Sequence, residues 1–394
     1  MFILPQPPDP PDSGGKIVLH HLVRYFRERH KTTLACLLHH PRDCDVIRET
    51  ESLYEKVLAF PAPPKFSIGV IGGAILSGKP YKAGKFWNTQ LDQAIRKILI
   101  QEEFDLIHVQ NFYMGQYITG NENAFKVLYK ENVERNIWYR YAETRLYSFM
   151  KKIAYIEAKR LDIFERNICR KFDKVMMISP SDLDQFRKSE PDLPLLYQPP
   201  GLDLKSYSFN TREPENLNSL LFTGSLSYYP NQDGIKWFLS EIFPEIHKKL
   251  PEIKIQFVGK DPPEWLKNLK DYPGIEVTGW VKDIKPYFEN AMGYIVPLRI
   301  GGGVRLKIIE AWAKGVPVIS TPVGAEGLPY KDGESLFLAS NPVEFVRSIK
   351  TLINNPETRQ NLINNGRKLV ENHFNEELVM PKLEYDYLSW LGNR

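Results

Sequence analysis

The sequence is poor in cysteine, has no long apolar run and carries no large excess of charge. Only three cysteines, Cys36, Cys44 and Cys169, are spread over 394 residues. This predicts neither a disulfide framework nor a paired zinc module, and it favours a reducing compartment. No apolar run reaches the roughly 18 residues of a membrane-crossing helix, and the first residues lack a basic region followed by an apolar core. We therefore expect a cytoplasmic protein.

The charge balance also limits the class of partner. Lysine and arginine number 52 against 48 acidic residues, a formal net charge of +4, which is far from the basic excess of proteins that track nucleic-acid phosphates. With 42% hydrophobic and 25% charged residues, the composition is that of a folded globular protein. We expect no nucleic-acid partner.

Length and periodicity predict two α/β domains. Short apolar runs bounded by Gly, Pro and Asp alternate with stretches of helical period, the pattern of βαβ units on parallel sheets. Periodicity disappears in the Pro-, Asn- and Ser-rich segment 199–214, which indicates an interdomain connection. We place the domains at 1–205 and 206–375, with a last helix at 376–394 that packs back toward the first domain.

The predicted elements follow this division. In the first domain we predict strands at 2–4, 33–38, 106–109 and 175–178, and helices at 17–29, 87–101 and about 141–171. In the second we predict strands at 219–223, 254–258, 275–278, 293–297 and 316–320, and helices at 232–249, 306–314, 342–354, 356–371 and 376–391.

The most informative segment is a glycine-rich turn between a strand and a helix. Gly301, Gly302 and Gly303 follow the strand at 293–297, so backbone N–H groups and the positive end of the helix can approach a phosphate closely. Arg305 and Lys307 add two cations where the helix dipole alone would favour acids. Glu310 shares a helix face with Lys307. The cations can bind a diphosphate while the carboxylate binds ribose hydroxyls, although a solvated amphipathic helix would have the same residue types.

This segment resembles the donor-binding signature of glycosyltransferase family 4, whose GT-B fold has two facing Rossmann-like doubly wound domains with a cleft between them. Three other segments resemble that family in the same order: residues 7–15, with Gly14 and Gly15; residues 222–231, with Gly224, Ser225 and Asn231; and residues 324–327, with Glu326 and Gly327. The stretches 228–231 and 297–310 are most similar to transferases of bacterial exopolysaccharide systems.

Two departures from the wider family bear on the donor site. The first of its two glutamates falls on Gly302, and its Arg and Lys in the turn that opens the second domain fall on Ser225 and Asn231. Arg305 and Lys307 can replace those cations, because an ion pair with phosphate needs a nearby charge and not a particular sequence position. We interpret the change as relocation of the cations.

In the first domain four polar residues resemble positions that contact the sugar or the acceptor. His108 and Gln110 match a His-x-His stretch whose second histidine is replaced, and Glu131 and Glu134 match a His-Asn-x-Glu stretch whose histidine is replaced. A polar residue at a strand end is equally well explained as a satisfied structural group.

The resemblance implies a hexosyltransferase-like enzyme that moves a sugar from a nucleoside diphosphate to a glycan or a lipid-linked acceptor, with retention of configuration and without a metal or other cofactor. It assigns catalysis to Arg305, Lys307 and Glu310. The alternative is a degenerate, non-catalytic GT-B protein that binds a nucleotide or a partner transferase. An NAD-dependent oxidoreductase is disfavoured, because neither domain opens with Gly-x-Gly-x-x-Gly and a following acid.

Three other motifs are weaker. Residues 73–80 match a phosphate-binding loop except that Pro80 supplies no hydroxyl for Mg²⁺. Asp43 and Asp45 form an Asp-x-Asp in what we interpret as a solvated turn after the strand at 33–38. The Cys/His group at 36–44 lacks a second ligand pair for zinc.

The stretch 135–174 is strongly basic. It contains eleven Lys or Arg and five Asp or Glu, interleaved with aromatic residues. Such a segment can rest on the anionic inner face of the cell membrane, and it can equally be a packed helix with a solvated basic face. The apolar segment 66–76 could border a lipid acceptor.

Overall fold

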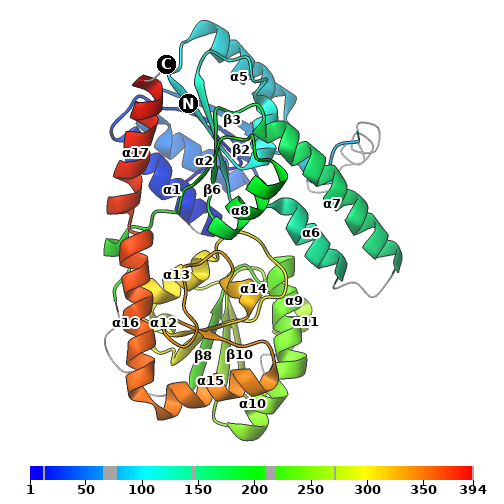
Figure 1. Cartoon of the computed structure of the whole chain (residues 1–394), viewed down its shortest axis with the longest axis vertical. Coiled ribbons are helices and arrows are strands. Elements are labelled where there is room, and N and C mark those ends of the chain that lie inside the picture. The colour runs from blue at the N-terminus through cyan, green and yellow to red at the C-terminus, as the bar shows by residue number, and fades with distance from the viewer. Residues whose placement is uncertain (12–13, 65–77, 144–147, 210–217, 270–271, 393–394) are drawn as a thin grey trace. The chain divides into compact units, whose positions relative to one another are not determined.

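The computed structural model describes residues 1–11, 14–64, 78–143, 148–209, 218–269 and 272–392 (Figure 1). Contacts divide the chain into two compact units, Met1–Leu202 with Glu376–Arg394, and Asp203–Asn375. Each unit is built on one parallel sheet. The prediction of two doubly wound α/β domains is confirmed.

The sheet of the first unit has seven strands in the order β3-β2-β1-β4-β5-β6-β7. β1 pairs with both β2 and β4, so successive connections leave it in opposite directions, which creates a topological switch point. The strands are β1 Phe2–Leu4, β2 Thr33–Leu38, β3 Lys56–Pro61, β4 Leu106–Gln110, β5 Phe125–Lys130, β6 Lys174–Met177 and β7 Leu195–Tyr197.

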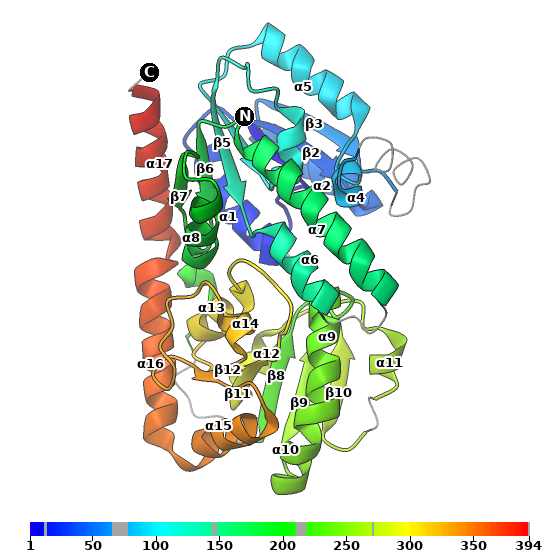
Figure 2. The same cartoon turned by 45° about the vertical axis from the view of Figure 1, so that its right-hand side comes forward.

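Helices cover this sheet, and the last helix of the chain belongs to the same unit. Figure 1 shows α17 beside α1, and Figure 2 shows α6 and α7 side by side. The helices are α1 Gly14–Arg27, α2 Pro41–Thr50, α4 Tyr81–Gly84, α5 Thr89–Gln101, α6 Glu134–Glu143, α7 Ser148–Cys169, α8 Pro180–Ser189 and α17 Glu376–Gly392, with 3-10 turns at Glu51–Leu53, Phe112–Tyr117 and Leu204–Ser206. The long helix predicted over about 141–171 is confirmed over 148–169 as α7, while residues 141–143 belong to α6, which packs beside it.

The sheet of the second unit repeats the same plan with the order β10-β9-β8-β11-β12-β13 (Figure 2). Its switch point lies between β8 and β11, which pair directly. The strands are β8 Ser219–Thr223, β9 Lys254–Val258, β10 Ile275–Gly279, β11 Gly293–Val296, β12 Val318–Ser320 and β13 Phe337–Leu338. Phe222, Phe238, Phe257 and Phe345 are fully buried in its core.

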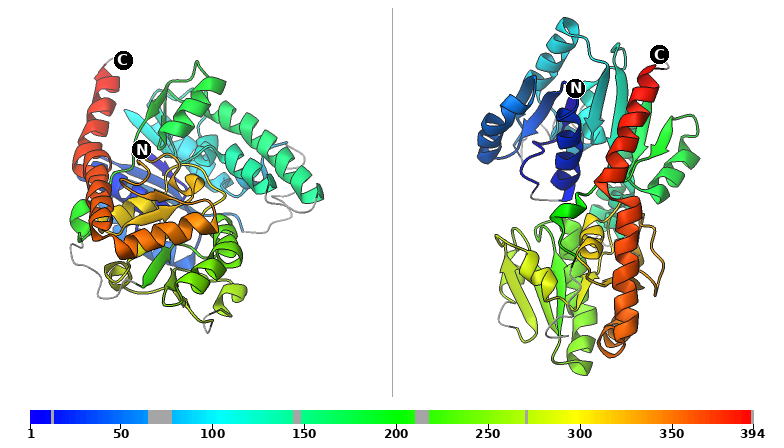
Figure 3. Two further views of the ribbon diagram at one scale, coloured as in Figure 1. Left: turned by 60° about the horizontal axis from the view of Figure 1, so that its bottom comes forward. Right: turned by 90° about the vertical axis from the view of Figure 1, so that its left-hand side faces the viewer.

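The helices of this unit include α13, which carries the predicted donor residues and packs on α16 (Figure 3). They are α9 Tyr229–Trp237, α10 Phe243–Lys249, α11 Glu264–Lys267, α12 Lys285–Glu289, α13 Leu306–Ala313, α14 Pro322–Ala325, α15 Pro342–Asn354 and α16 Pro356–His373.

The single helix predicted over 232–249 is interrupted. It begins earlier, at Tyr229, and a π turn at Phe238–Ile242 separates α9 from α10. Pro230 fits the first helical turn, where no N–H is needed. Pro244 lacks the N–H that would continue the hydrogen-bond ladder, which accounts for a widened turn before it.

Candidate functional site

Three glycine-containing loops leave neighbouring strands of the second sheet. Gly224 follows β8, Gly301–Gly303 follow β11, and Gly324–Gly327 follow β12. β11 pairs with β8 on one side and with β12 on the other. The carboxyl ends of strands at a switch point form the crevice in which α/β proteins bind ligands. The structure therefore brings three predicted segments to one edge of this sheet.

Glycine is required where these loops approach other backbone. Gly224 has a φ of 138° and Gly303 a φ of 69°, values that favour glycine over other residues. A Cβ atom added at Gly259, after β9, would lie 1.7 Å from the carbonyl oxygen of Gly224. The turn at Gly224 is thus held by close backbone packing, without side chains between the two loops.

Lys307, the second residue of α13, reaches the turn at the end of β8. Its Nζ donates to Oδ1 of Asn231 at 3.1 Å and lies 4.1 Å from the ring centroid of Phe222. The Asn231 amide donates in turn to the carbonyl oxygen of Ser225 at 2.7 Å. The ammonium therefore lies at the turn in which Ser225 and Asn231 replace two cations.

The Lys307 ammonium is in an unfavourable environment. Burial, and then the positive charge of Arg305, lower the pKa of Lys307 to about 7, while Glu310 opposes the shift. A negative charge bound beside it would stabilise the protonated form. Such a perturbed lysine at a strand-end crevice is typical of a ligand-binding site.

Glu310 lies one turn further along α13, and its pKa is shifted upward, whereas that of Lys307 is shifted downward. Burial raises the pKa of its carboxyl, and Lys314, Tyr207 and Lys307 oppose that rise. The Tyr207 hydroxyl donates to its Oε1 at 3.4 Å, and the Nζ of Lys314 lies 4.1 Å from the ring centroid of Phe288. The carboxylate thus accepts a hydrogen bond from Tyr207 and is stabilised by the charges of two lysines of its own unit.

Two of these side chains were missed by sequence reasoning. Lys314 is four residues after Glu310, so the helical i, i+4 rule could have found it. Tyr207 lies 103 residues before Glu310 in the connection after the first unit, and no sequence signal linked the two.

Arg305 lies next to this face but is oriented differently. It is the N-cap residue of α13, with extended backbone (φ −89°, ψ 92°), and not a residue of its first turn. Its Nη1 donates to the carbonyl oxygens of Gly302 and Gly303. A Cβ atom at Gly301 would collide with the guanidinium. Arg305 therefore folds over the glycine-rich loop, while Lys307 points toward β8.

The loop after β12 is shaped by a short capped helix. The Thr321 hydroxyl accepts a hydrogen bond from the Gly324 N–H at 3.0 Å at the start of α14. Glu326 is half-buried after this helix, and Gly327 has a φ of 79°. Both predicted residues thus lie in the loop that follows β12, the strand beside β11.

In the first unit, Gly14 and Gly15 open α1, the helix after β1. A Cβ atom at Gly15 would meet no atom within 4 Å, so the backbone there is open to approach. β1 and β4 form the switch point of this sheet, which is the edge at which a ligand of this unit is expected.

His108 and Gln110, the predicted sugar or acceptor contacts, are both fully buried. The His108 ring bonds to the Tyr387 hydroxyl at 2.6 Å and to Gln110 at 3.3 Å. Burial lowers the pKa of His108 to about 4. His108 is therefore a neutral core residue that joins β4 to α17.

Glu131 and Glu134 follow β5. Glu131 is half-buried, accepts from the Gln110 amide at 3.1 Å, and has a pKa raised by burial. Glu134 is buried and pairs with Lys82 at 2.9 Å. Glu131 is therefore more exposed than Glu134, and it is the only one of the four predicted residues of this unit that is not buried.

The family comparison concerns the second unit. Residues 218–355 match the family model for glycosyl transferases group 1. The chain contains a group 1 glycosyltransferase domain. This match supports a transferase of the glycosyltransferase class, as the sequence resemblance implied.

Two curated relatives share 22% and 28% of their aligned residues with this chain. An uncharacterized 44.6 kDa protein in the cps region of Klebsiella pneumoniae is 22% identical over 300 residues, which cover 73% of this chain and 76% of that protein. The capsular polysaccharide biosynthesis glycosyltransferase CapM of Staphylococcus aureus is 28% identical over 204 residues, which cover 48% of this chain and 53% of CapM.

Solved structures show the fold over the whole chain. HepE of Anabaena, solved in complex with UDP-glucose, superposes with a TM-score of 0.66 at 15% identity, covering 98% of this chain and 99% of HepE. Sucrose-phosphate synthase of Thermosynechococcus elongatus gives a TM-score of 0.65 at 14% identity, covering 92% and 100%. This glycosyltransferase has the GT-B fold.

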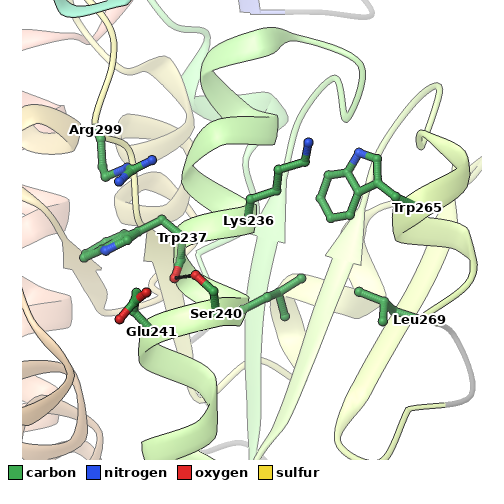
Figure 4. A pocket seen from close by; sticks show the side chains of 8 residues that line it. Lys236, Trp237, Ser240, Glu241, Trp265, Leu269 and Arg299 are labelled. Atoms are coloured by element: carbon green, nitrogen blue, oxygen red, sulfur yellow. Dashed lines mark hydrogen bonds between the residues drawn. The ribbon is translucent and has the colours of Figure 1, made fainter. Parts of the chain in front are cut away.

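A separate groove of about 530 Å³ lies along α9, the π turn and α11. Figure 4 shows Trp265 and Leu269 on one side and Trp237 with Arg299 on the other. Arg299 pairs with Asp233 at 2.8 Å. This groove is lined mainly by helix side chains, with Arg299 from the segment after β11, and none of the predicted donor residues lines it, so we do not assign the donor to it.

The weaker motifs do not form sites in the described residues. Asp43 is not in a solvated turn: it lies in α2, where its carboxylate accepts from the N–H groups of His39 and His40. Asp45 pairs with Arg48 on the same helix. Within the described ranges, no group of three His, Cys, Asp or Glu side chains could hold a metal ion. The segment 66–76 and most of 73–80 lie outside the described residues.

Proposed function

We propose that this glycosyltransferase moves a sugar from a nucleoside diphosphate to a glycan or lipid-linked acceptor in the synthesis of a surface polysaccharide or glycoconjugate. The observation that carries this proposal is the convergence of the Gly224 turn, the Gly301–Gly303 loop, Lys307 and Glu310 at the switch point of the second sheet. It is supported by CapM, a capsular polysaccharide glycosyltransferase, and by HepE, which was solved with UDP and with UDP-glucose.

The donor's parts match these groups. The diphosphate would lie against the backbone N–H groups of the loops and the Lys307 ammonium, with Arg305 holding the glycine-rich loop closed beside it. Glu310 would accept hydrogen bonds from the ribose hydroxyls. Glu326 and Gly327, on the loop after β12, would complete the donor site.

Catalysis would rest on stabilising the leaving group. As the sugar–phosphate bond breaks, negative charge grows on the diphosphate, and fixed cations in a partly buried site stabilise it more strongly than water does. No nucleophile is assigned to the protein, and we propose that the product retains the donor's anomeric configuration, with Lys307 supplying charge where other transferases use a divalent metal.

Activity is therefore expected to persist in EDTA. Sugar transfer or donor hydrolysis should proceed at an unchanged rate after exhaustive chelation, because the Lys307 charge is part of the chain. The assay follows nucleoside diphosphate release with and without chelator, with Lys307→Met as the inactive control. Loss of turnover in EDTA that Mn²⁺ or Mg²⁺ restores would contradict metal independence.

The second candidate is a non-catalytic GT-B protein that binds a nucleotide or a partner transferase. It is favoured by Gly302 and Ser225, which lack charged side chains, and by the burial of His108 and Gln110. Nucleotide binding without any hydrolysis of the cognate donor would support it over the enzyme.

We also propose that the protein is cytoplasmic and touches the anionic inner face of a membrane peripherally. Support comes from the basic excess over residues 135–174. In the described residues no helix is long and apolar enough to cross a bilayer.

A further inference from the structure

Helix α7 exposes a row of large apolar side chains. Phe149 is 71% exposed, Ile153 43%, Ile156 53% and Ile163 63%. At 3.6 residues per turn these four positions fall within roughly 80° of the helix circumference. They form one row, interrupted by Arg160 between Ile156 and Ile163, which we call the α7 stripe.

The stripe is not the core-facing side of the helix. Ala154, Ala158 and Leu161 lie on the opposite side and are fully buried. Glu165 also points inward, where it pairs with Lys130 of β5 at 2.7 Å with both side chains fully enclosed. The inner face of α7 is thus fixed to the sheet, and the stripe is an additional apolar face where a helix of this kind normally carries polar residues.

Charge on α7 is separated by face. All its acids are directed to partners in the body of the unit: Glu157 accepts from the Tyr81 N–H, Asp162 pairs with Arg135 and Arg166, and Glu165 pairs with Lys130. The exposed charged residues of the helix are Lys151, Lys152 and Lys159. At 3.6 residues per turn Lys152 and Lys159 lie along one edge of the stripe, so the surface on that side is positive.

We propose that the α7 stripe inserts shallowly into an anionic lipid surface while Lys152 and Lys159 bind the headgroups. This inference rests on the proposed peripheral membrane contact and assigns that contact to one face of one helix. Large apolar side chains flanked by lysines are the composition of helices that lie in the membrane interface. Anionic lipid supplies both the apolar medium and the opposite charge.

A second copy of the chain fits the stripe less well. In a two-fold interface the same surface meets itself, so the lysines of both copies would be brought together around the apolar row. Like charges in such a position oppose association. A lipid surface has no such conflict.

Vesicle co-sedimentation tests the stripe directly. The probe is a vesicle of equal parts phosphatidylglycerol and phosphatidylcholine at low salt, with pure phosphatidylcholine vesicles for comparison. The double variant Ile153→Gln/Ile156→Gln should bind at least about tenfold more weakly than the wild type, because two buried side chains are lost from the membrane. The matched control is Ile100→Gln on α5, where an isoleucine is 86% exposed but lies outside the stripe; it should bind as the wild type does.

The lysines should set the salt dependence. Lys152→Gln/Lys159→Gln should weaken binding at low salt by about fivefold per lysine and flatten its dependence on salt. Circular dichroism and unchanged melting temperatures establish that the variants fold.

Four results would overturn the proposal. The first two are a wild type that does not bind anionic vesicles, and an Ile153→Gln/Ile156→Gln variant that binds them as tightly as the wild type does. The other two are an equal loss of vesicle binding in Ile100→Gln, and a wild-type dimer in solution that becomes a monomer in Ile153→Gln/Ile156→Gln. Donor hydrolysis without vesicles should be unchanged in every variant. An inactive protein that still binds vesicles through the stripe would refute the proposed function and leave this inference standing.

Discussion

Replacement of Lys307 by methionine is expected to lower kcat by roughly a hundredfold or more while stabilising the fold. The fall in kcat is expected because the Lys307 ammonium stabilises negative charge that grows on the diphosphate in the transition state. Turnover should therefore fall by more than donor binding does. The gain follows because burial of this cation destabilises the folded protein. Trade-offs of this kind are common at functional sites.

The gain in stability should depend on pH in a defined direction. The pKa of Lys307 is lowered from 10.5 to about 7 in the folded protein, so the unfolded chain binds more protons between these values. The destabilisation is full below pH 7 and disappears as the pH rises toward 10.5. The melting temperature of Lys307→Met should therefore exceed that of the wild type more at pH 6.5 than at pH 9.

Steady-state kinetics and thermal melts of Lys307→Met measure both effects. The matched control is Lys350→Met, which removes an exposed lysine of α15 and should change neither. Unchanged kcat in Lys307→Met would remove the lysine from the mechanism, and a lower melting temperature at pH 6.5 would contradict its unfavourable environment.

The second large effect concerns the stability of the first unit. Lys130→Met should cost about 3–5 kcal/mol of unfolding free energy, because it leaves the buried Glu165 carboxylate without its cation. In the wild type the Lys130 Nζ also lies 3.9 Å from the ring centroid of Phe186. Burial already raises the pKa of Glu165 despite this partner, so the loss should be greater at high pH than at low pH.

Urea unfolding followed by circular dichroism measures this cost. Adding Glu165→Leu to Lys130→Met removes the stranded charge and should recover much of the stability. A single variant as stable as the wild type would show that the pair does not anchor α7 to β5.

Strands with uninterrupted apolar runs could be predicted from the sequence. β2 and β8 have the predicted bounds, because strands buried on both faces of a parallel sheet are mostly apolar. β5 was missed because it contains Lys126 and Lys130, which suggest a solvated segment. Lys130 is buried only because Glu165 lies beside it, 35 residues away in the sequence.

The candidate site was predictable where its chemistry is contiguous. The glycine-rich loop, Lys307 and Glu310 lie within ten residues, so their spacing on a strand, turn and helix suggested a donor site. The direction of Arg305 was not predictable, because the carbonyl oxygens of its own loop orient the guanidinium. The burial of His108 depends on Tyr387, which is 279 residues away.

The central claim is that the donor lies on α13, with its ribose at Glu310. Isothermal titration of the cognate nucleotide sugar, identified by a thermal-shift screen, tests this in the wild type and in Glu310→Gln. The amide keeps the size of the side chain but weakens charge-assisted hydrogen bonds, so the account predicts a loss of roughly 1–2 kcal/mol in donor binding with an unchanged fold. Wild-type affinity in a folded Glu310→Gln variant would contradict the placement of the ribose on this helix.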